Sequence, residues 1–293
     1  FLKNKGLEST ILVPNDFPKF LKWMPDAKKV VIAEYKRKKA GEAIYNANVI
    51  FCLDFNSAAR IGILGDWLTK SWATKILIDH HQQPEDFDYI YSDVTIPATS
   101  QMVYHFIEAL GEENLVDENV ASCLYTGIMT DTGGFRFRST SATTHRITAN
   151  LIEKGANPTA ISSDTWDTNS VSRLHLLSLV LARIEMVKDG KAAILYLKRD
   201  ELKEFGYQKG DTEGFVNYGL SIAGAQVAVL FIEDLYQDFI KISFRSKDEV
   251  DVNQFARKHF NGGGHINAAG GRYDKTIEET IADFKEFIEE EEF

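Results

Sequence analysis

Cysteine is scarce in this chain of 293 residues, which contains only Cys52 and Cys123. Two cysteines give no sign of a disulfide framework, so we expect both to act as small core residues in a reducing, cytoplasmic environment. No apolar run approaches the roughly 20 residues that a membrane-spanning helix needs. No secretory apolar segment stands at the start either. The sequence therefore predicts a cytoplasmic globular protein without a membrane partner.

A surplus of basic residues is also lacking. The formal net charge is −10, which argues against a broad surface that coats DNA or RNA. A small anionic substrate stays compatible with this charge, because bound cations can reverse the local field. We find no internal repeat and no low-complexity tract, and the length is sufficient for two domains with full cores.

Short apolar runs alternate with helical patterns in the first half of the chain. We expect strands at 10–13, 29–33, 49–53 and 75–78, and helices at 58–68, 99–110, 117–129 and 143–154. This alternation predicts an α/β domain with a mostly parallel sheet flanked by helices.

The second half predicts a smaller α/β domain. Asn, Pro, Ser, Thr and Asp dominate 156–170, which is typical of a linker, and a bridging helix is expected at 172–187. Further strands are expected at 192–197, 226–232 and 239–244, and helices at 211–218, 252–259 and 277–290. We therefore divide the chain into a first domain at 1–155, a linker with a bridging helix at 156–188, and a second domain at 189–293.

The first six residues resemble the end of a helix that Gly6 caps. A strand pattern follows directly. We therefore expect a further strand and helix upstream of Phe1.

The sharpest local signal is the segment 75–81, Lys-Ile-Leu-Ile-Asp-His-His. Its apolar residues predict a strand buried on both faces. Asp79, His80 and His81 then fall at the carboxyl end, where open α/β sheets place their sites. Successive side chains point different ways, so one imidazole can bind a metal while the other faces a substrate. A histidine satisfied within the core or at the surface is the alternative.

Two carboxylates have similar surroundings. Asp54 follows the strand at 49–53, and Asp131 follows the apolar run at 124–130 and precedes a Gly-Gly pair. Such segments could bring Asp54, His80 and Asp131 together at one sheet edge. Oxygen and imidazole ligands suit a divalent ion such as Mn²⁺, Mg²⁺ or Zn²⁺. A helix N-cap is the alternative for each carboxylate, and a turn is a further one for Asp131.

A second strong feature is the run of Gly262, Gly263 and Gly264 before His265. Three glycines allow positive φ and close approach of the backbone. The following residues can open a helix, and backbone N–H groups at such a start cradle anions. A flexible loop is the alternative.

Two arginines could contribute positive charge. Arg245, expected at the end of the strand at 239–244, could clamp a phosphate, or it could be an exposed edge arginine. Arg136 and Arg138 follow the Asp131 segment and could add charge beside bound metals. A surface salt bridge is their alternative role.

Taken together and in this order, these motifs resemble a known family. Asp79-His80-His81, Gly262-Gly263-Gly264-His265, the Asp54 segment and Asp-Thr-Gly-Gly-Phe at 131–135 are similar to the DHH phosphoesterases with a DHH-associated C-terminal domain. The resemblance is strongest to the NrnA-type branch of short-oligonucleotide hydrolases, often labelled exopolyphosphatase-related proteins. It covers essentially the whole chain.

The resemblance implies a site for two divalent metal ions, Mn²⁺ in the first place and Mg²⁺ as the alternative. Asp54 would bridge both ions, and His80 and Asp131 would bind one of them. His81, counted with Asp79 as catalytic, would contact the phosphate and could protonate the leaving oxygen. The substrate would be held by Arg136, Arg245, Gly262, Gly263, Gly264 and His265.

The resemblance also implies the substrates, which are RNAs a few nucleotides long and 3′-phosphoadenosine 5′-phosphate (PAP). Linear or cyclic dinucleotides and short polyphosphate stay open, as does a homodimer. The family's first motif, a His followed by an Asp-x-Asp pair, has no match in the sequence, and we expect it upstream of Phe1. A non-catalytic nucleotide- or RNA-binding module is the alternative if that motif is truly absent.

Overall fold

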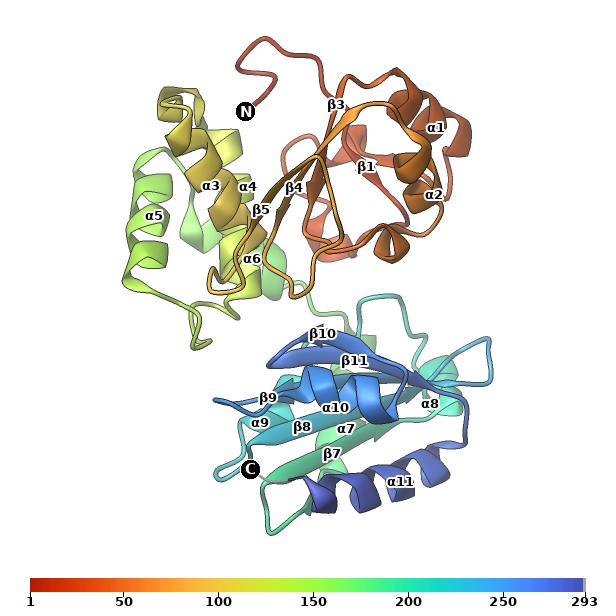
Figure 1. Ribbon diagram of the computed structural model, residues 1–293. Coiled ribbons are helices and arrows are strands. Elements are labelled where there is room, and N and C mark those ends of the chain that lie inside the picture. Colours follow the sequence, from red (N-terminus) through yellow and green to blue (C-terminus); the bar gives the residue numbers. More distant parts are fainter. Residues whose placement is uncertain (292–293) are drawn as a thin grey trace. The chain divides into compact units, whose positions relative to one another are not determined.

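The computed structural model describes residues 1–291. The chain forms two compact units, Phe1–Thr168 and the residues from Asn169 onward, and both combine strands with helices (Figure 1). This confirms the predicted α/β class. No helix among the described residues is long and apolar enough to cross a membrane.

The strands of the first unit are all parallel to their partners. They are β1 (Leu12–Val13), β2 (Val31–Ile32), β3 (Val49–Leu53), β4 (Thr74–Asp79) and β5 (Tyr89–Ser92). β1 pairs with β2, while β3, β4 and β5 form a three-stranded sheet in that order. Leu53 pairs with Ile78, so β3 and β4 end beside each other. Parallel pairing therefore places the residues that follow these two strands at the same sheet edge.

The helices of the first unit form two groups. They are α1 (Arg37–Asn46), α2 (Ile63–Lys70), α3 (Thr99–Ala109), α4 (Glu118–Asp131), α5 (Ala142–Glu153) and α6 (Pro158–Trp166). The helices α1 and α2 pack on the strands around Val31 and Leu64, whereas α3 to α6 share a core around Met129 and Leu151. Burial of these apolar faces holds the sheet edge in place.

The second unit is built on one six-stranded sheet in the order β10-β11-β9-β8-β7-β6. Its elements are α7 (Val171–Ala182), β6 (Glu185–Val187), β7 (Ala192–Leu197), α8 (Arg199–Glu204), α9 (Val216–Leu220), β8 (Val227–Glu233), β9 (Ile240–Ser246), α10 (Val252–His259), β10 (Gly263–His265), β11 (Ala268–Tyr273) and α11 (Ile277–Glu290). β7 and β8 are parallel, and the other neighbours are antiparallel.

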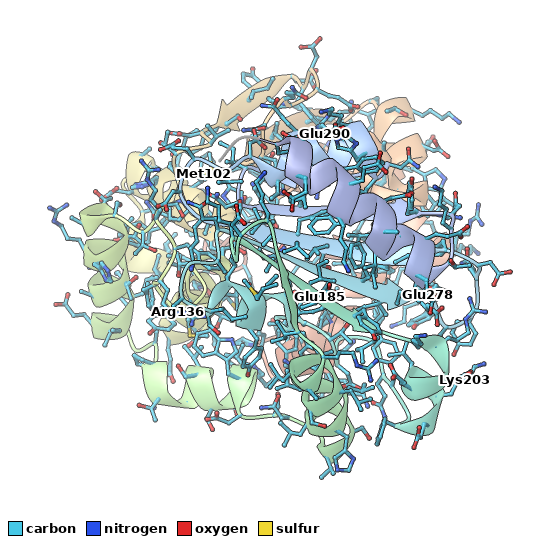
Figure 2. The ribbon with its side chains drawn as sticks, turned by 90° about the horizontal axis from the view of Figure 1, so that it is seen from below. Met102, Arg136, Glu185, Lys203, Glu278 and Glu290 are labelled. Carbon is cyan, nitrogen blue, oxygen red and sulfur yellow. The ribbon has the colours of Figure 1, made fainter. Side chains whose placement is uncertain are left out.

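Both faces of this sheet are covered. Alternate residues of β7 belong to different cores: Ile194 packs with α10 and α11, and Leu195 packs with α7 and α9. Figure 2 shows α11 lying across the strands, with Glu278 and Glu290 near its two ends. This double coverage explains why β7 and β8 are nearly continuous apolar runs.

Several predicted elements differ from the structure, among them the helix predicted at 58–68, which is a 3-10 turn at Ala58–Ile61 followed by α2. The segment 156–170, predicted as an irregular linker, contains α6, because Asn157 caps the helix, Pro158 takes its first position and Ile161 is buried. The helix predicted at 172–187 ends at Ala182, because the residues after it join the sheet as β6. The helix predicted at 211–218 is a series of turns followed by the short α9.

Candidate functional site

The carboxyl end of β4 carries the Asp-His-His triplet. Leu77 and Ile78 are fully buried and fix the strand in the core. Asp79, the last residue of β4, has no exposed side-chain surface, and the His80 and His81 side chains are about one-tenth exposed. Three ionisable groups thus lie just inside the surface, where they need polar partners.

Asp79 and His81 form a buried pair. The Nδ1 atom of His81 lies 2.7 Å from Oδ1 of Asp79, and the His81 backbone N–H donates to Oδ2 at 3.1 Å. The carboxylate therefore favours the His81 tautomer that carries its proton on Nδ1. The second ring nitrogen, Nε2, is left as the atom that can exchange a proton with a substrate.

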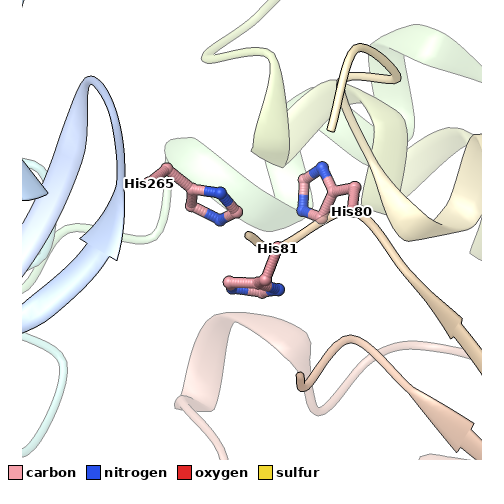
Figure 3. A group of neighbouring side chains, drawn as sticks. All are labelled: His80, His81 and His265. Atoms are coloured by element: carbon pink, nitrogen blue, oxygen red, sulfur yellow. The ribbon is translucent and has the colours of Figure 1, made fainter. Parts of the chain in front are cut away.

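His80 points in a different direction, and its ring stands at 84° to that of His81 (Figure 3). Its Nδ1 atom donates to the carbonyl oxygen of Ile96 at 3.0 Å. Its Nε2 atom then faces Oδ1 of Asp54 at 3.5 Å and Oδ2 of Asp131 at 4.0 Å. A backbone carbonyl on one ring nitrogen is the usual support of a metal-binding histidine, since it leaves the other nitrogen as the ligand.

Asp54 follows β3 directly and adopts a left-handed backbone conformation, with φ 65°. Its N–H still donates to Ile78 of β4, so the turn begins at the sheet itself. The Thr99 hydroxyl donates to Oδ1 of Asp54 at 2.9 Å. Left-handed backbone at a residue other than glycine is uncommon, and here it aims the carboxylate across the sheet edge toward His80.

Asp131 reaches the sheet edge from a helix, which agrees with the helix predicted at 117–129, whereas Asp54 and His80 follow strands. It is the last residue of α4, and the chain then turns through Gly133 and Gly134, which have φ 57° and φ 73°. Gly134 N–H donates to Met129 and Gly133 N–H to Thr130, which is the Schellman pattern of helix ends. The two glycines of the Asp-Thr-Gly-Gly-Phe motif therefore fix where the carboxylate stands.

Arg136 lies in the same turn, and it is exposed. Its Nε atom donates to the carbonyl of Gly133 at 2.8 Å, so part of the guanidinium serves the turn. The structure thus gives Arg136 a local partner, and its predicted contact with the substrate stays a prediction.

The electrostatics of the cluster follow from crowding three groups together. Burial and the neighbouring charge of Asp54 raise the pKa of Asp131 to about 7, against the opposing effect of His80. Burial would also raise the pKa of Asp54, but the hydrogen bond from His80 and the charge of His81 outweigh it, so this pKa is lowered. Burial would lower the pKa of His80, but its bonds to Asp54 and Ile96 raise it overall. Such divergence of neighbouring pKa values is typical of functional sites.

The donor set suits a divalent cation. One ligand atom each from Asp54, His80 and Asp131 lie within 4.8 Å of one another, and the same holds for Asp54, Asp79 and His81. Asp54 belongs to both groups. Carboxylate oxygens combined with imidazole nitrogen fit Mn²⁺, Mg²⁺ or Zn²⁺.

In the second unit, Arg245 lies in the interior of the sheet. β9 has β11 on one side and β8 on the other, and Arg245 pairs with Ala268 and Ala228. The guanidinium is half-buried, and its Nη1 donates to Phe244 O at 2.8 Å. Burial lowers the pKa of this guanidinium, and the charge of Glu213 opposes the shift. The alternative of an exposed edge arginine is therefore wrong.

The glycine run forms a hairpin and opens no helix, which corrects the predicted helix start. β10 holds Gly263, Gly264 and His265 and pairs with β11. A Cβ atom on Gly262 or Gly264 would collide with backbone oxygen of β11, and the Gly264 N–H donates to Oδ1 of buried Asn253 at 2.8 Å. Close backbone packing therefore explains Gly262 and Gly264, and a helix start for anions does not form.

Two groups that orient the site residues are not indicated by the sequence pattern. Thr99 was placed only as a helix start, yet its hydroxyl holds Asp54. The Ile96 carbonyl, which orients His80, belongs to the irregular segment before α3. A backbone carbonyl leaves no signal in the side-chain pattern, whereas the hydroxyl at the start of α3 could have been considered.

Two family models match the chain. The "DHH family, N-terminal domain" matches residues 2–128, and the "DHHA1 domain" matches residues 189–291. The first match covers the Asp54 and Asp79-His80-His81 segments, and the second covers Arg245 and the glycine hairpin.

Characterised and solved proteins are also similar. "Bifunctional oligoribonuclease and PAP phosphatase NrnA" of Bacillus subtilis is 27% identical over 80% of this chain and 73% of its own length. A "probable" protein of the same description from Streptococcus mutans is 30% identical over 77% of this chain and 70% of its own length. The crystal structure of an exopolyphosphatase-related protein from Bacteroides fragilis superimposes with a TM-score of 0.93 at 39% identity, covering 98% of this chain and 84% of that one.

Proposed function

The chain belongs to the DHH family and carries a DHHA1 domain after its DHH domain, and on that premise we propose that it is a metal-dependent phosphoesterase. Its proposed substrates are short oligoribonucleotides and PAP. The names of its relatives describe activity on both. The observation that carries the proposal is the convergence of Asp54, His80 and Asp131, whose ligand atoms lie within 4.8 Å of one another.

In this proposal Asp54, His80 and Asp131 hold a divalent ion, and Asp54 is shared with a second one. The sharing rests on the resemblance to the DHH family, because Asp79 and His81, the other members of the second donor group, are bonded to each other. When bound, such ions neutralise phosphoryl oxygens and make water a stronger nucleophile. The side chain of Asp54 is about half exposed, which leaves the ligand accessible to a substrate. Mn²⁺ is the ion we propose first, with Mg²⁺ as the alternative.

His81 is the proposed general acid. Its Nδ1 is committed to Asp79 at 2.7 Å, so proton transfer to the leaving oxygen would use Nε2. Asp79 is fully buried and holds the imidazole in that orientation through the contact with Nδ1. Asp79 thus acts through His81 and orients the proton donor.

Arg245 and the glycine hairpin are the proposed substrate contacts of the second unit. The cross-strand neighbours of Arg245 are both alanines, which leave room for a guanidinium on that face of the sheet. A planar guanidinium can bind two phosphate oxygens at once. This part would select a nucleotide-like ligand and take no part in the bond cleavage. His265, at the end of β10, and Arg136 complete the proposed contacts.

The decisive test is Asp54→Asn in the protein as its gene encodes it. This change keeps the size of the side chain and removes the shared charge. We expect Mn²⁺-dependent hydrolysis of a diribonucleotide and of PAP to fall by more than about a hundredfold, since even outer supports of metal ligands contribute about 10–100-fold. Asp66→Asn, an exposed change on α2, is the matched control and should keep full activity.

The substrate panel should include linear and cyclic dinucleotides and short polyphosphate. Faster hydrolysis of one of these compounds than of a diribonucleotide and PAP would make that compound the preferred substrate. Near-wild-type turnover in Asp54→Asn would refute the assignment of the site. Binding of RNA with no turnover by the unaltered protein would favour the non-catalytic binding module.

A further inference from the structure

The helices α1 and α2 are neighbours in the first unit (Figure 1). Residues of both helices line an open groove of about 420 Å³. We call it the α1–α2 groove. Residues that line it include Arg37, Lys38, Gly41, Tyr45, Trp67 and Lys70. The groove is lined by none of the acidic and histidine residues of the candidate metal site, so it is a separate feature.

Positive charge is concentrated at this groove, although the whole chain has a net charge of −10. Arg37, Lys38 and Lys70 line the groove together with one acidic residue, Glu42, and Lys36 and Lys39 are exposed beside Arg37 and Lys38 in the chain. Lys38 is 3.9 Å from Glu42, a distance at which an exposed pair contributes little. Within residues 1–291, no ion pair involves the other four of these cations. The groove therefore presents charge that is complementary to an anion.

Aromatic rings line the same place. The side chain of Tyr45 is largely exposed (73%), as is that of neighbouring Trp72 (65%). The Trp72 indole donates to the Tyr45 carbonyl at 3.1 Å, which fixes the two residues against each other. Trp67 forms a wall of the groove, with the guanidinium carbon of Arg37 5.9 Å from its ring centre. Exposed rings beside unpaired cations offer both stacking and phosphate contacts.

Gly41 lies next to the ring of Trp67, which is partly buried against the core of the first unit. It stands in the middle of α1, where glycine is less favourable than alanine by about 1 kcal/mol. A Cβ atom there would meet only the Trp67 ring, at 3.8 Å, which is an ordinary contact. Packing within the fold thus does not require a glycine, and a larger side chain at this position would cover more of the ring.

We propose that the α1–α2 groove binds single-stranded RNA, with the cations on its phosphates and one base stacked on Trp67. Cations and aromatic rings at one place match a ligand that carries phosphates and bases together, which a lipid headgroup does not. This binding needs no hydrolysis, so it stands apart from the proposed catalytic function. It would allow the protein to bind RNA strands longer than a dinucleotide.

The first test is Arg37→Glu combined with Lys70→Glu. Fluorescence anisotropy with a labelled oligouridylate of about twelve nucleotides, in EDTA to prevent cleavage, measures binding. We expect affinity to fall at least about tenfold. The slope of log affinity against log salt should also become shallower by about 1.4, since each phosphate contact on a single strand contributes about 0.7. Lys28→Glu with Lys203→Glu changes the net charge equally at exposed positions elsewhere and should have a much smaller effect.

The second test separates stacking from folding. Gly41→Leu should keep or raise the melting temperature, because leucine favours a helix, and should weaken RNA binding about tenfold by covering the ring. An equal loss in the two charge variants would overturn the proposal. So would unchanged binding in Gly41→Leu, or binding of anionic lipid vesicles in place of RNA.

Discussion

The two units present polar groups on their sheets in opposite ways. In the first unit the groups are side chains at element ends, and buried bonds aim them: Asp79 holds His81, and the Ile96 carbonyl holds His80. In the second unit the hairpin is mainly backbone, packed so closely that Gly262 has no room for a Cβ atom. The first unit should therefore be most sensitive to the loss of functional groups, and the hairpin to the addition of atoms.

The largest expected effect is on the proton donor of the first unit. His81→Ala should retain the bound metal and lose rate on every substrate by about 10²–10⁴-fold, the usual contribution of general acid–base catalysis. Metal analysis and kcat for a diribonucleotide and for bis(p-nitrophenyl) phosphate measure the two effects. Asp79→Asn should show a similar pattern with a smaller loss. Stoichiometric loss of metal in His81→Ala would make this residue a ligand and not the acid.

Arg245→Ala should affect only substrates that reach the second unit. We expect kcat/KM for short oligonucleotides to fall about ten- to a hundredfold, equivalent to the roughly 1.5–3 kcal/mol of a charged hydrogen bond. Hydrolysis of bis(p-nitrophenyl) phosphate should change much less. Lys241→Ala, on the same strand and exposed, is the control. Equal losses on both substrates would place Arg245 in the chemistry or in folding.

Gly262→Ala should destabilise the second unit without removing a functional group. Its new methyl group would press on Gly270 O of β11, and overpacking of this kind costs about 1–3 kcal/mol. Gly263→Ala is the matched control, because its methyl group would be 3.5 Å from the nearest atom. Chemical denaturation measures both variants. Equal stability of the two variants would show that the hairpin adjusts to the added methyl group. The hairpin would then not be especially sensitive to added atoms.

A graded effect is expected in the pH dependence of metal binding by the first unit. The metal-free pKa of Asp131 is about 7 and that of His80 is raised, and both groups must lose a proton to act as ligands. Apparent affinity for Mn²⁺ should therefore fall as pH decreases through about 7, by up to about tenfold per pH unit for each proton. Isothermal titration calorimetry at pH 6 to 8 measures this change. Asp131→Asn should flatten it, and an unchanged slope would contradict the shifted pKa.

Stability of the metal-free protein should respond with the opposite sign. The pKa of Asp131 is higher in the folded state than its ordinary value of 3.8, so the folded state binds this proton more tightly. The resulting stabilisation is complete below about pH 3.8 and is lost as pH rises through 7. Asp131→Asn should thus stabilise the metal-free protein above pH 7 more than at pH 5, modestly because the side chain is partly exposed.

The sequence predicts the bounds of an element well where its apolar periodicity and its capping residues indicate the same ends. The predicted bounds of β3, β7, α10 and α11 coincide with the structure. In α11 the Thr276 and Glu279 side chains form a capping box ahead of a regular apolar stripe. Local chemistry and burial point the same way in these elements, so the sequence alone was sufficient.

The prediction was wrong where distant residues decide the structure. β10 consists of two glycines and a histidine, and only its pairing with β11 makes it a strand. The end of α7 depends on β6 joining β7. In the site, the sequence predicted that Asp54, His80 and Asp131 would meet, and their ligand atoms lie within 4.8 Å. The helix predicted at 117–129 is α4, which carries Asp131 at its last residue.

The position of Asp131 at the last turn of α4 has an electrostatic consequence. The peptide dipoles of this 14-residue helix add up to about half a negative charge at its carboxyl end, beside the carboxylate. The carboxylate and the carboxyl end of the helix together attract a cation more strongly than either does alone. A metal ion held there would be attracted by the peptide groups of the helix as well as by its ligands, so that a kink or break within α4 would weaken metal binding without touching a single ligand.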